Sequence, residues 1–213
     1  MNTTQIFKNP ALLSMRALAL LWLDKVEWRH HGIGVLQGYV RENSEPEIRL
    51  HIWSKLLLKP GMDLSGDIHD HRFDMVSHVL SGFVEHEEII ENADPDGDHA
   101  IMALTHARAA ADTQYHGPTT PLPGRFRVRR ARHIIDQGYS YSLPSQNFHH
   151  SPLVELGDIA ITCVEKHRQQ DAPARLLYPI SRPPVMAFGH AMDMGLVGEI
   201  LAAAKRRLSQ EIS

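Results

Sequence analysis

The sequence predicts an all-β domain, a barrel or jelly roll, with an α-helix near each end of the chain. Short segments of strand-forming residues recur along most of the 213 residues. Glycine and proline turns separate these segments at regular spacing, which is typical of barrels and jelly rolls. Helical periodicity appears only near the two termini.

The N-terminal region has the pattern of a helix. Asn9 and Pro10 are residue types that favour the N-cap and the first helical position. A leucine-rich pattern continues from there to about Trp28 and predicts a broad buried face. Glycines at positions 32, 34 and 38 then predict turns.

The strand signals follow in order along the chain. The expected strands are residues 33–40, 48–58, 68–80, 83–90, 126–135, 139–143 and 159–164. The segment 99–112 fits either a helix, from its alanines, or another strand. After Lys166 four prolines predict a tail over the surface, and a helix is expected over 192–208.

These patterns divide the chain into three parts. Residues 1–32 form an N-terminal helical segment, residues 33–170 the barrel, and residues 171–213 a proline-rich tail with the C-terminal helix. The terminal helices either cap the barrel or pack against a second subunit in a homodimer. With 22 basic residues, 25 acidic residues and a net charge of −3, the composition gives no reason to expect a nucleic-acid or membrane partner.

Cysteine and histidine content indicate the compartment and the chemistry. The single Cys163 excludes an internal disulfide and fits a reducing compartment. The apolar run 11–23 is interrupted by Arg16, lacks the features of a signal peptide and is too short to span a bilayer, so we expect a cytoplasmic protein. Fifteen histidines raise the expectation of a metal site.

Two separate runs carry the histidines of greatest interest. His69 and His71 are one residue apart, and alternate side chains of a strand project to the same face. His149 closes a second run that begins at Gly138. A return strand carrying His149 would complete a site of three imidazoles.

At these residues the sequence resembles the cupin superfamily over roughly residues 48–165. His69, His71 and Gly82 match that family's first motif, His-x-His followed by a glycine. Gly138, Pro144 and His149 match its second motif. The resemblance implies a cupin barrel of the jelly-roll, or double-stranded β-helix, type.

Three positions depart from the family pattern. Met75 occupies the place of the usual acidic ligand, Gln146 replaces the inner glycine of the second motif, and Leu153 stands where asparagine is expected. On a regular strand Met75 would share the face of His69, and Asp74 would point away. A bulge at Phe73 would instead turn Asp74 into the site.

The favoured ligand set is therefore His69, His71 and His149, with Asp74 as the alternative addition. Three neutral imidazoles leave the full charge on a divalent ion, which favours a chelating anionic substrate. Within the superfamily this set resembles thiol dioxygenases and some diketone-cleaving enzymes. We expect Fe(II), because such a set leaves positions for substrate and O₂, although imidazole also binds zinc, nickel and manganese.

The expected function is that of a non-haem iron dioxygenase acting on a small thiol or amino-acid-like carboxylate. Tyr141 and His51 are candidate catalytic residues: a phenol near the site could donate a proton, and His51 lies on the preceding strand. The alternatives are a lyase, isomerase or decarboxylase that uses the metal as a Lewis acid, and a ligand-binding cupin without enzymatic activity.

Overall fold

The computed structural model describes residues 4–31, 34–42, 44–57, 68–104, 119–152, 159–182 and 193–211. Most of this part of the chain forms strands, arranged in two antiparallel sheets that fit a β-sandwich or barrel. Sheet A has the order β1 (Gln5–Lys8), β11 (Tyr139–Leu143), β6 (Asp74–Ser81), β13 (Ala160–His167), β4 (Glu47–Trp53), β3 (Val35–Arg41) and β2 (Trp28–His31). Sheet B has the order β10 (Phe126–Asp136), β7 (Phe83–Ala93), β12 (His149–His150), β5 (Ile68–His69), β14 (Ala174–Pro179), β8 (His99–Leu104) and β9 (Thr119–Pro121).

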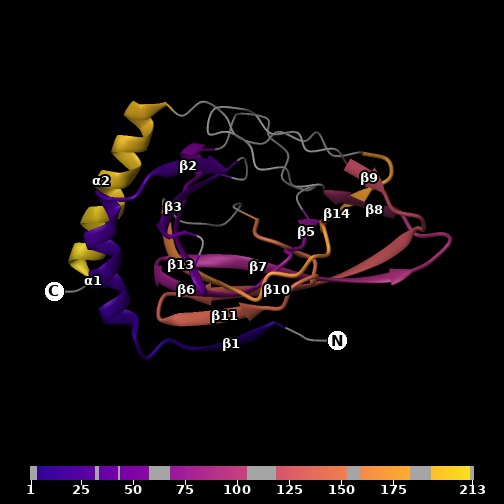
Figure 1. Cartoon of the computed structure of the whole chain (residues 1–213), viewed down its shortest axis with the longest axis horizontal. Coiled ribbons are helices and arrows are strands. Elements are labelled where there is room, and N and C mark those ends of the chain that lie inside the picture. Colours follow the sequence, from indigo (N-terminus) through magenta and orange to yellow (C-terminus); the bar gives the residue numbers. More distant parts are fainter. Residues whose placement is uncertain are drawn as a thin grey trace.

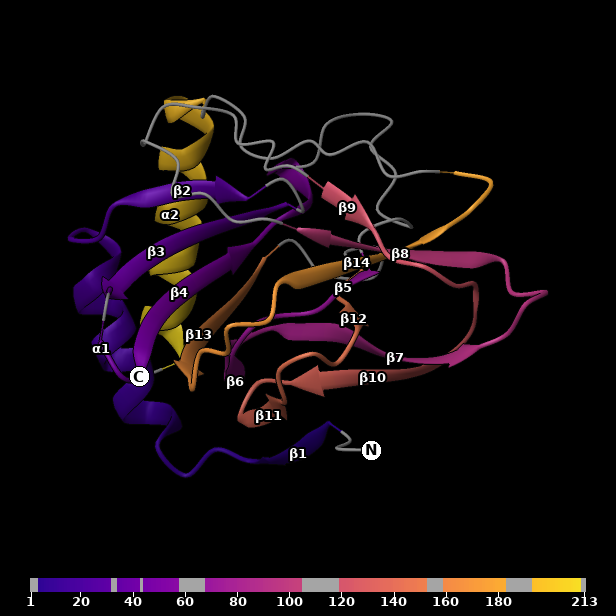
Figure 2. The ribbon, with the colours of Figure 1, turned by 45° about the vertical axis from the view of Figure 1, so that its right-hand side comes forward.

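Two helices, α1 (Leu12–Leu23) and α2 (Met194–Gln210), form a third layer. They lie together on one side of the molecule, against sheet A and away from sheet B (Figure 1, Figure 2). Asp193 caps α2 by accepting hydrogen bonds from the backbone N–H groups of Gly195 and Leu196, at 2.9 and 3.2 Å. No helix in the described ranges is long and apolar enough to cross a membrane.

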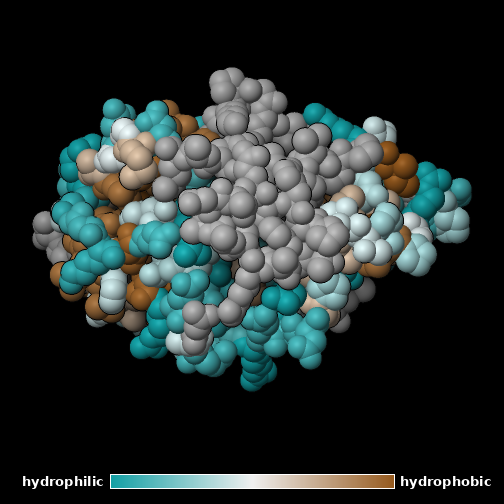
Figure 3. Space-filling model, turned by 45° about the horizontal axis from the view of Figure 1, so that its top comes forward, coloured by the Kyte–Doolittle hydropathy of each residue, from teal (hydrophilic) through white to brown (hydrophobic). Residues whose placement is uncertain are grey.

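Apolar side chains fill both spaces between the three layers. One cluster joins the helices to the outer face of sheet A, and it includes Leu23, Leu36, Ile52, Ile161, Val197 and Ile200. A second cluster lies between the sheets, and it includes Val35, Trp53, Met75, Val84, Ile135, Tyr141 and Leu143. The surface on the side of the helices still shows hydrophobic atoms among hydrophilic ones (Figure 3), and Leu13, Leu18 and Leu21 of α1 are exposed.

A buried arginine ties α1 to α2 and to sheet A. Arg16 is 5% exposed; its Nε donates to the carbonyl oxygen of Leu80 at 2.6 Å, and its Nη2 lies 2.7 Å from Oε2 of Glu211. Ser81 Oγ donates to the other carboxylate oxygen of Glu211 at 2.9 Å. The arginine that interrupts the apolar N-terminal run therefore fixes the helical layer in place.

Two glycines stand where the chain passes from one sheet to the other. Gly82 (φ +72°) joins β6 to β7, and Gly138 (φ +86°) joins β10 to β11. The two turns meet, because Gln137 N donates to Gly82 O at 2.8 Å and Gly138 N to Val79 O at 3.0 Å. A side chain at Gly82 would also meet the carbonyl oxygen of Ile159 at 2.9 Å, so this position requires glycine.

The structure corrects several predicted elements. The helix begins at Leu12 rather than directly after Asn9, although the Asn9 side chain still accepts a hydrogen bond from Ala11 N at 2.9 Å. It ends at Leu23, and Trp28–His31 is strand β2. The predicted strand 48–58 ends at Trp53 and is followed by a 3-10 turn, η1 (Lys55–Leu57).

The continuous strand predicted over 68–80 is wrong. Only Ile68–His69 belongs to sheet B as β5, and β6 begins at Asp74 in sheet A, because the chain changes sheets between them. The argument from strand parity, which placed Met75 beside the histidines, therefore does not apply. Met75 is 8% exposed and packs in the cluster between the sheets.

The terminal regions contain strands that the sequence did not predict. β1 and β2 fall within residues 1–32 and pair in sheet A. The region predicted as a surface tail contains β14, which pairs with β5 and β8 inside sheet B. In the segment 99–112, His99–Leu104 is strand β8, and positions 105–112 lie outside the described residues.

Candidate metal centre

His69, His71 and His149 come together as the candidate metal site. One nitrogen from each ring lies within 4.8 Å of the other two. The ring centroids are 4.9 Å apart for His69 and His71, 4.4 Å for His69 and His149, and 4.8 Å for His71 and His149. This arrangement is compatible with a cupin-like metal site in a β-rich fold.

Strand pairing brings the two histidine runs together. His149 is the Cα partner of His69 across the β12–β5 pair, and also of Glu88 across the β12–β7 pair. His71 lies in the segment that leaves sheet B, where its backbone carbonyl accepts a hydrogen bond from Gln146 N at 2.9 Å. The strand pair at His69 and the hydrogen bond at His71 therefore fix the position of one histidine run relative to the other.

Gln146 lies in a turn whose backbone conformation favours glycine. Its φ is +62°, a left-handed value that costs a residue with a side chain about 1–2 kcal/mol. In this turn its backbone N–H donates to the carbonyl oxygen of His71 at 2.9 Å. Glycine at this position would avoid that strain.

A buried ion pair lies behind the histidines. Asp70, between His69 and His71 in sequence, has a side chain with 0% exposure, and its Oδ2 accepts a hydrogen bond from Arg175 Nε at 2.5 Å. The backbone N of Arg175 donates to Asp70 Oδ1 at 2.6 Å, and Arg175 Nη2 donates to the carbonyl oxygen of Gln146 at 2.8 Å. The Arg175 guanidinium also lies 4.6 Å above the ring of Phe148. One arginine from β14 thereby links both histidine runs.

Burial sets the charge state of these groups. Burial lowers the pKa of His149 well below its usual value, and the neighbouring His69 and His71 lower it further. A neutral imidazole is the form that binds a metal ion. Burial raises the pKa of the Asp70 carboxyl, while the charge and hydrogen bonds of Arg175 oppose that shift.

Asp74 has another role in the structure. Its Oδ1 accepts a hydrogen bond from the backbone N of Ser145 at 2.8 Å. Among the described residues it does not belong to the group of three ligand donors. The contact pins the start of β6 to the turn that precedes His149.

The structure places Tyr141 and His51 on sheet A. Tyr141 is 2% exposed within the cluster between the sheets. Burial raises its pKa, against a hydrogen bond with Ser77 that lowers it, so the phenol keeps its proton at neutral pH. His51 lies on β4, with its ring 6.1 Å from that of Trp53, and the group of three donors does not include it.

Two residues near the site escaped the sequence analysis. His86 on β7 is 0% exposed, and its ring lies 5.8 Å from His149 and 4.8 Å from Tyr141. Burial, together with His133 and His150, lowers the pKa of His86 to about 3. The other is Arg175, more than one hundred positions from Asp70. Only the register of sheet B, which the sequence does not reveal, brings either residue to the site.

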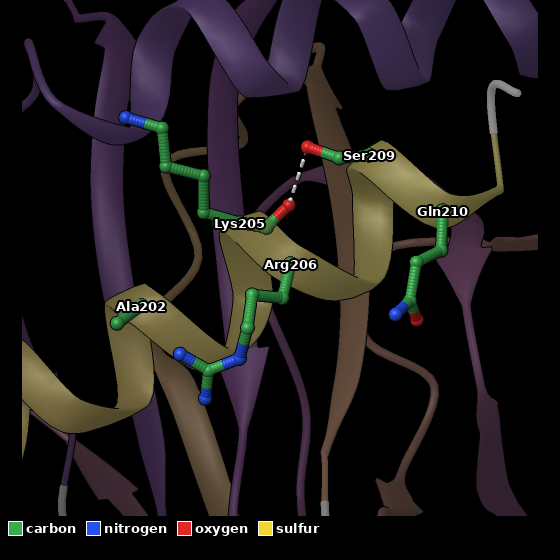
Figure 4. Close-up of a pocket in the computed structure, with 5 residues that line it drawn as sticks. All are labelled: Ala202, Lys205, Arg206, Ser209 and Gln210. Carbon is green, nitrogen blue, oxygen red and sulfur yellow. Dashed lines mark hydrogen bonds between the residues drawn. The ribbon is translucent and has the colours of Figure 1, made fainter.

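A surface hollow on α2 lies apart from the histidines. Its lining comes from Ala202, Lys205, Arg206, Ser209 and Gln210 (Figure 4). Its one hydrogen bond among these residues joins Ser209 Oγ to the carbonyl oxygen of Lys205 at 2.8 Å. Sheet A separates α2 from the three histidines, so this hollow belongs to the helical surface and not to the candidate metal centre.

Comparison of the sequence with models of known protein families, and with curated proteins, finds no match.

Proposed function

We propose that the protein is a metal-dependent oxygenase of the cupin type, a mononuclear non-haem Fe(II) dioxygenase acting on a small chelating anion. A thiol or an amino-acid-like carboxylate is the substrate class that we favour. The observation that carries the proposal is the convergence of three imidazole donors, each within 4.8 Å of the others, from two distant runs of the chain.

The donor set fits a transition-metal ion. Imidazole is a common ligand of iron and of zinc, and a set of three protein ligands leaves positions for other molecules. Because no carboxylate among the described residues joins the group, a bound divalent ion would keep its full positive charge and favour an anionic partner. When bound, iron would supply the redox chemistry that brings O₂ and substrate together.

The residues of the chain would orient and shield the bound molecules. The Asp70–Arg175 pair links the two histidine runs and would support the ligands from behind. The apolar cluster between the sheets excludes water on the Tyr141 side. Tyr141, protonated at neutral pH, is a hydrogen-bond donor in this region, and we assign it the donation of a proton or hydrogen bond to the reacting molecule.

The experiment is anaerobic loading with Fe(II), followed by measurement of oxygen uptake across a panel of thiols, amino acids and diketones. We expect stoichiometric binding of iron and uptake of O₂ with one class of substrate. His69→Ala, His71→Ala and His149→Ala should each lose both. Asp74→Asn should keep the metal, because Asp74 bonds to the backbone of Ser145 instead.

The same experiment separates the alternatives. Substrate turnover without oxygen uptake would replace the proposal with a lyase, isomerase or decarboxylase that uses the metal as a Lewis acid. Iron binding with no turnover of the panel would favour a ligand-binding role. A correctly folded protein that retains no transition metal would refute the metal centre itself.

A further inference from the structure

The interior face of β7 carries a histidine with a ring nitrogen that no described residue contacts by a hydrogen bond. His86 is 0% exposed, and its ring lies beside those of His149 and Tyr141, at 5.8 and 4.8 Å. Its Nε2 is 3.2 Å from the hydroxyl oxygen of Thr4. Its Nδ1 is buried and has no hydrogen-bond partner among the described residues.

An unsatisfied polar atom at this depth requires an explanation. More than nine in ten buried polar groups in proteins are hydrogen-bonded, and an unpaired one destabilises the fold. The surroundings of His86 include Val84 on the same face of β7 and the ring of Tyr141, where an apolar side chain would pack without this penalty. A ligand bound nearby would satisfy the nitrogen.

His86 stands next to the metal centre without belonging to it. Among the described residues, the group of close ligand donors contains only His69, His71 and His149. His86 lies two residues before Glu88 on β7, so the two side chains share one face of sheet B, and Glu88 is the Cα partner of His149. It is therefore placed to contact a molecule held by the three histidines.

We propose that His86 binds a small anionic ligand at this centre by donating a hydrogen bond from Nδ1. In this proposal the Thr4 hydroxyl, which can donate or accept a hydrogen bond, donates to Nε2, and the neutral ring carries its proton on Nδ1. In that tautomer Nδ1 is a hydrogen-bond donor, which matches an anion and not a cation. The inference rests on the proposed metal centre and adds to it a residue that selects the charge of the bound molecule.

The test uses cobalt-loaded protein and azide as the anionic probe. Co(II) gives visible bands that report both its own binding and that of azide. The variants are His86→Leu, which removes the donor, His86→Gln, which keeps an amide donor, and Thr4→Val, which removes the partner of Nε2. His78→Gln is the control, because both ring nitrogens of His78 have partners, Ser140 Oγ at 2.7 Å and Glu165 Oε1 at 3.3 Å.

We expect Co(II) affinity to stay within about twofold of wild type in every variant. Azide affinity should fall about tenfold in His86→Leu, which corresponds to the loss of one hydrogen bond. It should fall less in His86→Gln and Thr4→Val. His78→Gln should bind azide as the wild type does. A purely structural role would lower the melting temperature of the variants and leave azide affinity unchanged.

Unchanged azide affinity in His86→Leu would overturn the inference while leaving the metal centre intact. Loss of Co(II) affinity in the same variant would also overturn it, because His86 would then act on the metal. A wild-type protein that binds no cobalt would refute the proposed metal centre, and the inference with it.

Discussion

Replacing Arg175 with methionine tests how the histidine runs are held. The substitution removes the Nε bond to Asp70 at 2.5 Å and the Nη2 bond to the Gln146 carbonyl at 2.8 Å. Methionine keeps an unbranched apolar chain to cover Phe148. The main effect is therefore to leave the Asp70 carboxylate, with 0% side-chain exposure, without its counter-charge.

The structure sets the size of this effect. Removing one partner of a buried ion pair costs about 3–5 kcal/mol. We expect the lower end, about 3 kcal/mol, because the backbone N of Arg175 still donates to Asp70 Oδ1 at 2.6 Å. Since Asp70 and Gln146 hold the backbone on both sides of the three rings, metal affinity should also fall, by about 10–100-fold.

The assay is urea unfolding of the metal-free protein, together with a Zn(II) competition titration. Arg127→Met is the matched control, because Arg127, on β10 of the same sheet, pairs with Asp94 but has a side chain that is 64% exposed. This variant should change neither the free energy of unfolding nor the affinity for zinc. The double variant Asp70→Asn/Arg175→Met should be more stable than Arg175→Met, since no buried charge remains. A loss below about 1 kcal/mol in the single variant, or an unchanged zinc affinity, would refute the reasoning.

Three further predictions concern the fold. Gly82→Ala should lower the free energy of unfolding by about 2 kcal/mol, because φ is +72° and the new Cβ would meet the Ile159 carbonyl oxygen at 2.9 Å. Gly198→Ala, with open space around the new Cβ, should raise it by about 0.5–1 kcal/mol, and equal effects of the two variants in urea unfolding would contradict this geometry. The free energy of unfolding of the metal-free protein should fall by about 2 kcal/mol between pH 7 and pH 5 through His86, because the unfolded ring takes up a proton near pH 6.5 whereas burial holds the folded pKa at about 3. This loss of stability should be smaller in His86→Gln, and the same dependence on pH in both proteins would contradict the prediction. Burial, with Glu165 nearby, raises the pKa of Cys163 to about 12, so a disulfide reagent at pH 8 should label it only at the rate of unfolding, and immediate labelling of the native chain would show that the thiol is accessible.

The sequence predicts the candidate donors better than the path of the backbone between them. His69, His71 and His149 could be selected from their spacing, and the positive φ of Gly82 explains why its place in the motif is filled by glycine. The sequence did not reveal the break between β5 and β6, because residues 68–80 contain no glycine or proline to mark the end of a strand. A change of sheet depends on partners far along the chain.

The sequence did not reveal the roles of Arg175 and His86 for a similar reason. Arg175 lies among prolines that suggested a surface tail, yet β14 pairs on both sides within sheet B. His86 sits in a strand that was predicted, but its closeness to His149 depends on the pairing of β7 with β12. Local pattern gives the strand and its faces, whereas the neighbours of each face come from topology.

The two histidine runs pair with each other in both sheets. His149 faces His69 on sheet B, Leu143 faces Met75 on sheet A, and the turns at Gly82 and Gly138 meet beyond them. The β-ladder thus places His69 and His149, and the hydrogen bond from Gln146 N to the carbonyl oxygen of His71 holds this residue beside them. A chelator should accordingly strip the protein without unfolding it, and a different divalent ion could be exchanged into the finished fold.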